Sequence, residues 1–195
     1  FMIEEEKVIP TLVKIDNSKQ LEPLFLEIKK LGMVAVFNRI QDSKHNLILT
    51  TGGNLYHVDY KDQLDAHDLF SFSNAKLEDV EIKQQIHSLF SNKAVKKITY
   101  NLKSLLQLIN SKNENIAFHA FDDLMLMDYV LNAGNKAHVL LDIINIYSGS
   151  NPTDNTYYAS YFIDCYNRLI TKLVENKALH LYDSIDLPLC YILHD

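Results

Sequence analysis

The side chains that could bind a metal ion or act as a nucleophile lie singly along the chain. The two cysteines, Cys165 and Cys190, each fall in an apolar, helix-like stretch without a CxxC or Cys/His spacing. No two histidines have a spacing typical of metal ligands, so neither a zinc site nor a disulfide framework is indicated. We expect buried, unreactive thiols and surface histidines. The histidines are His45, His57, His67, His87, His119, His138, His180 and His194.

Basic residues are too few to suggest a strong nucleic-acid-binding surface. The chain has 19 Lys and Arg against 25 Asp and Glu, a formal net charge of −6 at pH 7. Strong sequence-independent binding needs clustered positive charge to displace counterions. Only Arg39 and Arg168 could form bidentate contacts with phosphate. The small cluster of Lys96, Lys97 and Lys103 is expected to be a solvated face, and DNA should bind weakly.

Five tyrosines in the last third of the chain offer a second route to nucleic acid, because aromatic rings can stack on bases. We favour the alternative that they pack a helix against a sheet and keep their hydroxyls at the rim. The five are Tyr147, Tyr157, Tyr158, Tyr161 and Tyr166.

The elements that would position these side chains follow from hydrophobic periodicity. Met33–Phe37 is apolar throughout, which predicts a central strand buried on both faces. Gly52-Gly53-Asn54 predicts a hairpin. Strands are expected at Thr11–Ile15, Met33–Phe37, Asn46–Thr50, Leu55–Asp59, Val95–Thr99 and Ile116–Phe118. Helices are expected at 18–32, Asp79–Phe90, Asn101–Asn110, Asp122–Leu131, His138–Tyr147, Thr156–Val174 and Asp183–Leu193.

This order, a three-strand meander, then strand–helix alternation, then a helical tail, predicts an α/β fold with a mixed sheet flanked by helices. The 195 residues, 47% hydrophobic and 23% charged, suit one domain of ordinary size, residues 1–195. No apolar run is as long as a membrane span, so we expect a cytoplasmic protein without a membrane partner. Phe1 before Met2 suggests either residues added for expression or a domain excised from a longer chain.

Four segments, taken in order and with their spacing, resemble one protein family. They read MVAVFNRI at 33–40, KITYNLK at 97–103, FDDLMLMDYVLN at 121–132 and YYASYFID at 157–164. Together they resemble the 3′–5′ proofreading exonuclease domain of bacterial DNA polymerase I, in polymerase family A. The resemblance covers nearly the whole chain, and Ile185–Leu189 is similar to the segment that leads into the polymerase thumb. It implies a ribonuclease H-like fold.

The resemblance also implies where a nuclease would hold its metal ions. Members of the family bind two divalent metals through four carboxylates, and a tyrosine orients the attacking water. Here the carboxylate positions are occupied by Asn38, Ile40, Leu105 and Phe162, and only the tyrosine is retained, as Tyr158. Two divalent ions about 4 Å apart repel by roughly 15 kcal/mol at an effective dielectric near 20, so a site must supply negative charge. We therefore expect no metal, no cofactor and no catalytic residue here.

Other carboxylates could rebuild a single-metal site. Asp42 would share the strand face of Asn38 if the strand extends that far, and Asp123 matches an aspartate outside the four-ligand set. The favoured alternative is that these two carboxylates are solvated or cap helices. Asp164 lies two residues beyond the fourth ligand position, about 200° around a helix, and should point away.

These observations predict a catalytically inactive 3′–5′ exonuclease-like domain of a DNA polymerase I that serves replication and repair. Its expected role is structural, its expected partner is the polymerase domain of the same chain, and DNA contacts would be weak or made through that parent enzyme. Two alternatives stay open. One is an active nuclease of the wider DEDD superfamily, similar to ribonuclease D, with displaced metal ligands. The other is a free-standing interaction module.

The apolar residues at three former ligand positions suggest a further expectation. Ile40, Leu105 and Phe162 come from three elements that the implied fold brings to one place. We expect them to pack together and fill the former metal cleft, because without metals a set of carboxylates would repel one another.

Overall fold

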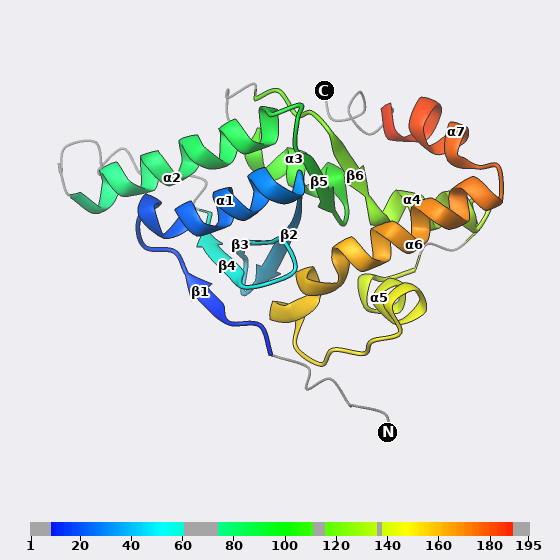
Figure 1. The fold of residues 1–195 in the computed structure, drawn as a ribbon, viewed down its shortest axis with the longest axis horizontal. Coiled ribbons are helices and arrows are strands. Elements are labelled where there is room, and N and C mark those ends of the chain that lie inside the picture. Colours follow the sequence, from blue (N-terminus) through cyan, green and yellow to red (C-terminus); the bar gives the residue numbers. More distant parts are fainter. Residues whose placement is uncertain (1–8, 61–73, 111–115, 136–137, 189–195) are drawn as a thin grey trace.

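The computed structural model describes residues 9–60, 74–110, 116–135 and 138–188. A six-stranded sheet in the order β1-β4-β3-β2-β5-β6 forms its centre (Figure 1). β2 is antiparallel to β3 and β3 to β4, whereas the other neighbouring pairs are parallel. The strands are β1 (Leu12–Lys14), β2 (Met33–Gln41), β3 (Lys44–Thr50), β4 (Leu55–Asp59), β5 (Lys96–Thr99) and β6 (Phe121–Asp123).

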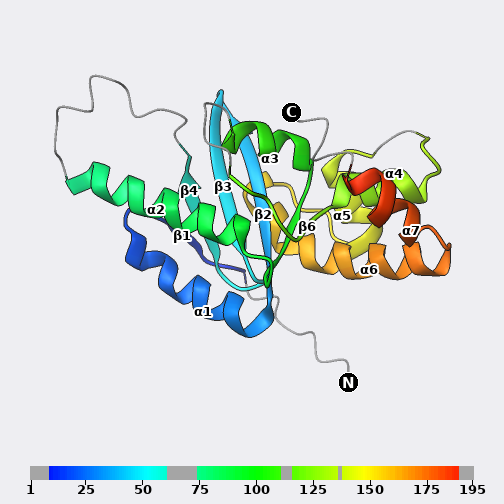
Figure 2. The same ribbon diagram turned by 90° about the horizontal axis from the view of Figure 1, so that it is seen from above.

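Helices cover both faces of this sheet, which confirms the predicted α/β fold. Figure 2 shows the sheet between α1 and α2 on one side and α4, α5 and α6 on the other. The helical elements are η1 (Ser18–Leu21), α1 (Glu22–Leu31), α2 (Asn74–Ser91), α3 (Leu102–Ile109), α4 (Leu124–Leu131), α5 (Leu140–Ser148), η3 (Asn155–Tyr161), α6 (Phe162–Glu175), α7 (Leu179–Leu181) and η4 (Tyr182–Asp186).

The central strand β2 separates two hydrophobic cores, as its continuous apolar sequence predicts. Successive side chains of a strand point to opposite faces. Val34 and Val36 therefore join the core under α1, α2 and α3, while Ala35 and Phe37 join the core under α4, α5 and α6. All four are buried. We call these two clusters the α1–α3 core and the α4–α6 core.

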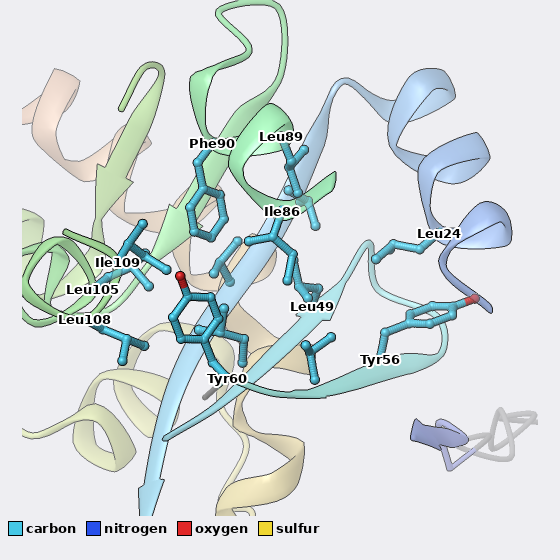
Figure 3. Packing of buried hydrophobic residues seen from close by; sticks show 14 of the residues in the cluster. Leu24, Leu49, Tyr56, Tyr60, Ile86, Leu89, Phe90, Leu105, Leu108 and Ile109 are labelled. Atoms are coloured by element: carbon cyan, nitrogen blue, oxygen red, sulfur yellow. The ribbon is translucent and has the colours of Figure 1, made fainter. Parts of the chain in front are cut away.

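The helices contribute leucine, isoleucine and aromatic side chains to each core. Part of the α1–α3 core is drawn in Figure 3. Its helical members are Leu21, Leu24, Ile28, Ile82, Ile86, Leu89, Phe90, Leu102, Leu105, Leu106, Leu108 and Ile109. The helical members of the α4–α6 core are Leu124, Met127, Val130, Leu140, Ile143, Ile144, Tyr147, Ala159, Phe162, Cys165, Tyr166, Leu169, Leu173 and Tyr182.

Turn chemistry fixes the strand register near the candidate site. Gly32 ends α1 with a φ of 72°, a left-handed conformation that glycine adopts at little cost. Asp42 and Ser43 join β2 to β3 with φ values of 51° and 61°, so this turn has the positive φ pair of a type I′ hairpin. The predicted hairpin between Asn46–Thr50 and Leu55–Asp59 is confirmed as β3 and β4.

The predicted strand at Ile116–Phe118 is wrong. These residues form no strand, and the edge strand β6 begins at Phe121, where it pairs with Lys97 of β5. The Phe118 ring instead packs 5.5 Å from that of Phe90 and 5.1 Å from that of Phe121, centroid to centroid. The apolar character of this segment therefore reflects packing in the α1–α3 core rather than strand pairing.

The C-terminal part of the chain also differs from the expected helices. The long helix predicted from Thr156 divides into η3 and α6. Of the helix predicted at Asp183–Leu193, the described part forms η4, a π-helical turn, and the residues after 188 lie outside the described ranges. None of the helices in the described part of the chain is both long and apolar enough to cross a membrane.

Candidate functional site

Asn38, which the resemblance assigns to the first of the four ligand positions, lies near the end of β2 where only β3 still pairs with it. Its side chain is half-buried and hydrogen-bonded on both sides. The Nδ2 amide donates to Ser104 Oγ of α3 at 3.4 Å, and His45 Nδ1 of β3 donates to Asn38 Oδ1 at 3.2 Å. A neutral amide with protein partners thus takes the place of a metal-binding carboxylate.

The three apolar residues at the other ligand positions do not pack together, so the expectation that they fill one cleft is wrong. Ile40 is 56% exposed. Leu105 is fully buried in the α1–α3 core and Phe162 in the α4–α6 core, where its ring lies 5.6 Å from that of Phe37. The physical reason is that α3 and α6 contribute to the cores on opposite faces of the sheet, whereas Ile40 lies near the exposed end of β2, beyond its pairing with β5.

Tyr158, the retained member of the motif, lies in η3 beside β2. Its ring centroid is 6.1 Å from that of Phe37, and its side chain is half-buried. Arg39 ties the same two elements together, because its Nη1 donates to the side-chain oxygens of Asn155 and Thr156. Tyr158 therefore contributes to packing against the sheet, as we expected for the tyrosines.

The carboxylates considered for a rebuilt metal site are either exposed or already hydrogen-bonded to the backbone. Asp42 lies in the exposed β2–β3 turn, beyond the end of the strand. Asp123 is 1% exposed and accepts hydrogen bonds from the backbone N–H groups of Asn101, Leu102 and Met125, each at 2.9–3.0 Å. Burial raises the pKa of the Asp123 carboxyl, although these hydrogen bonds act to lower it. Asp164 is exposed on α6.

The donor set at the four positions does not fit a pair of divalent ions. Metal ions of the type used in phosphoryl transfer prefer carboxylate and other oxygen ligands, and here only the Asn38 carbonyl is of that kind. Within the described ranges, no group of three or more His, Cys, Asp or Glu side chains is arranged to hold a metal ion. No catalytic step through a metal follows from these residues.

The prediction of a solvated lysine face is wrong for Lys97 and holds only in part for Lys96. Lys97 is fully buried, and its Nζ donates to the carbonyls of Asn92 and Val95, both at 2.7 Å. Burial lowers the pKa of Lys97 to about 8. Lys96 forms an ion pair with buried Asp122 at 2.9 Å. Lys103 is exposed and the Lys96 side chain is 40% exposed, but Lys96 is already paired and Lys97 is buried, so the three lysines do not form a continuous track for phosphate.

A buried network around Asp128 was missed by the sequence analysis. Asp128 lies on α4 and is fully buried. Its Oδ2 accepts from His138 Nδ1 at 2.8 Å, and its Oδ1 accepts from Tyr147 OH at 2.7 Å and Asn132 Nδ2 at 3.1 Å. His138 is therefore not a simple surface histidine. The spacing Asp-x₉-His-x₈-Tyr matches no local rule, so sequence could not have revealed this network.

The cysteine prediction is confirmed where the structure describes it. Cys165 is fully buried in the α4–α6 core, and burial raises the pKa of its thiol to about 12. A thiol with that pKa is protonated and unreactive at neutral pH. Cys190 lies outside the described residues.

Known proteins of similar structure indicate which fold this chain has. No family model matches the chain. The POL domain of Pol1 from M. smegmatis is similar with a TM-score of 0.69 and 15% identity, over 93% of this chain and 31% of that one. Escherichia coli RNase D, described as an exoribonuclease, is similar with a TM-score of 0.68 and 10% identity, over 94% and 50%. The fold is ribonuclease H-like.

Further solved structures agree with this fold assignment. The catalytic core of RRP6 from Trypanosoma brucei is similar with a TM-score of 0.65 and 14% identity, over 93% of this chain and 52% of that one. The chain thus spans between a third and about a half of the length of these three structures. The chain has a ribonuclease H-like fold, and identities this low carry no more than the fold.

Proposed function

We propose that this chain is a catalytically inactive 3′–5′ exonuclease-like domain of a DNA polymerase I-type enzyme, and that it serves as a scaffold for the polymerase domain. The observation that carries the proposal is the state of the four ligand positions. Asn38 is hydrogen-bonded to protein, Ile40 faces solvent, and Leu105 and Phe162 lie in separate hydrophobic cores. None of the four supplies negative charge.

The fates of the other candidate carboxylates support the same proposal. A displaced site would need acids with free oxygens near the sheet end of β2. The Asp123 carboxylate is already used by three backbone N–H groups, and Asp42 stands in an exposed turn. The order of the motif segments, including Asn101-Leu-Lys103 and Tyr129–Asn132, favours a polymerase parent. At the level of the fold, Pol1 and RNase D are nearly equally similar.

A nuclease assay separates this proposal from the ribonuclease D-like alternative. End-labelled single-stranded DNA and RNA are incubated with the chain at millimolar Mg²⁺ or Mn²⁺, and shortening from the 3′ end is followed on a gel. We expect no shortening beyond that of an EDTA control. Metal-dependent trimming that Asp42→Asn abolishes would refute the proposal and support displaced ligands. Lys44→Gln, in the same exposed hairpin, is the matched surface control.

A further inference from the structure

Tyr182 is fully buried although it lies in the short helical segment at the C-terminal end of the described chain. It is one of the largest side chains with essentially no exposed surface, while Asp183 and Ser184 beside it are exposed. It begins the π-helical turn η4 (Tyr182–Asp186). Such turns are rare and occur frequently at functional sites. This segment therefore inserts one aromatic side chain deep into the domain.

The hydroxyl of Tyr182 is bound on both sides by the edge strand β6. It donates to Asp122 Oδ1 at 2.7 Å and accepts from the backbone N–H of Asp123 at 3.1 Å. Lys96 holds the other carboxylate oxygen of Asp122 at 2.9 Å, and its Nζ also donates to Tyr166 OH at 2.9 Å. A hydrogen bond to a buried, ion-paired carboxylate is directional and stronger than one between neutral groups.

These contacts connect the segment to the edge of the central sheet and to the starts of two helices. Asp122 and Asp123 belong to the sheet, and the Asp123 side chain caps the first turns of α3 and α4. Leu187, directly after η4, packs against both the α1–α3 core and the α4–α6 core. The chain therefore leaves the domain along a path fixed by two independent kinds of contact.

We propose that Tyr182 is a positioning residue that sets the direction in which the chain leaves this domain, and thereby the placement of a domain that follows it. The inference rests on the proposed scaffold function. Domains joined by an unanchored linker move relative to one another by default. A scaffold can orient its neighbour only if the connecting segment is immobilised, and the Tyr182–Asp122–Lys96 arrangement holds the part of that segment that the structure describes, up to residue 188.

Hydrogen exchange of the 195-residue chain, followed by mass spectrometry, tests this role. Tyr182→Phe keeps the buried ring but removes the hydroxyl. We expect amides in 179–188 to exchange faster by about 10-fold or more, since a hydrogen bond to a charged group is lost. The Asp123 amide loses its own acceptor and should also exchange faster. The other amides of β5 and β6 should change by no more than about two-fold, since the α4–α6 core is retained.

Two further variants keep the test decisive. Tyr166→Phe removes a hydroxyl that accepts a hydrogen bond from Lys96, but it leaves the contacts of the C-terminal segment unchanged. Exchange in 179–188 should therefore stay at the wild-type rate. If Tyr182→Phe does not fold, Asp122→Asn removes the charge that the tyrosine binds and should loosen the same segment. Unchanged exchange in 179–188, or equal acceleration throughout the chain, overturns the inference. Trimming of DNA by the wild-type chain would instead refute the proposed function and leave this readout intact.

Discussion

Reintroducing a carboxylate at the former ligand positions should have opposite consequences at Leu105 and at Ile40. Leu105→Asp removes a fully buried side chain from the α1–α3 core, whereas Ile40→Glu changes a side chain that is 56% exposed. Burying a leucine contributes roughly 1.5–3 kcal/mol, and an unpaired buried polar group costs about 1–3 kcal/mol more. Leu105→Asp should therefore destabilise the domain by roughly 3–6 kcal/mol, and Ile40→Glu by less than about 0.5 kcal/mol.

Urea denaturation followed by circular dichroism measures both free energies of unfolding. The pH dependence provides an internal check. Burial raises the pKa of a carboxyl, so the neutral form of the introduced aspartate is the less costly one. The destabilisation by Leu105→Asp relative to wild type should therefore shrink as the pH falls from 7 towards 4. Equal stabilities for Leu105→Asp and wild type, or a cost at Ile40→Glu as large as at Leu105→Asp, would refute the assignment of Leu105 to the core.

Three further predictions concern other groups. Burial lowers the pKa of Lys97 to about 8, against about 10.5 for an exposed lysine. The unfolded chain therefore binds more protons than the folded one above pH 8, and the free energy of unfolding should rise between pH 8 and pH 10 by up to about 3 kcal/mol. Urea titrations at several pH values measure this rise, and Lys97→Met should abolish it. Asp128→Ala leaves Tyr147 and His138 without their acceptor and should destabilise by roughly 3–5 kcal/mol in the same assay; a cost below about 1 kcal/mol would contradict the network. Single-stranded DNA should bind with a Kd no tighter than about 10⁻⁴ M at physiological salt in fluorescence anisotropy, and micromolar binding with a steep salt dependence would reveal a basic track.

Elements specified by local pattern could be predicted from sequence. The apolar run Met33–Phe37 gave a buried central strand, and the Gly52-Gly53-Asn54 turn gave the hairpin of β3 and β4. The hairpin depends on residues that are close in sequence, and the central strand depends on the burial of one continuous apolar segment. The parallel pairing of β1 with β4 was not foreseen, because it joins residues about 43 positions apart, such as Leu12 and Leu55.

Burial of charged groups could not be predicted, because their partners are distant or are backbone atoms. Lys96 and Lys97 are adjacent in sequence, yet Lys96 pairs with Asp122, whereas Lys97 donates to two backbone carbonyl oxygens and lies over the Phe121 ring. Nothing in the residue types distinguishes these two environments. Ile116–Phe118 shows the complementary error, since short apolar runs do not reveal whether they pair as strands or only pack.

The separation of the four ligand positions bears on how a nuclease-like fold can exist without metals. A cluster of acids is costly unless ions neutralise it, because like charges repel at short range. Three of the four positions have separate stabilising surroundings: Asn38 has Ser104 and His45, Leu105 has the α1–α3 core, and Phe162 has Phe37, whereas Ile40 faces solvent. Because these surroundings are independent, none of the substitutions requires the others for stability, as expected for sites without shared partners. Restoring acids at Leu105 and Phe162 would place charges in two separate hydrophobic cores, and those two costs would add. The domain is therefore held in its present form by packing and hydrogen bonding at each position rather than by one rebuilt site.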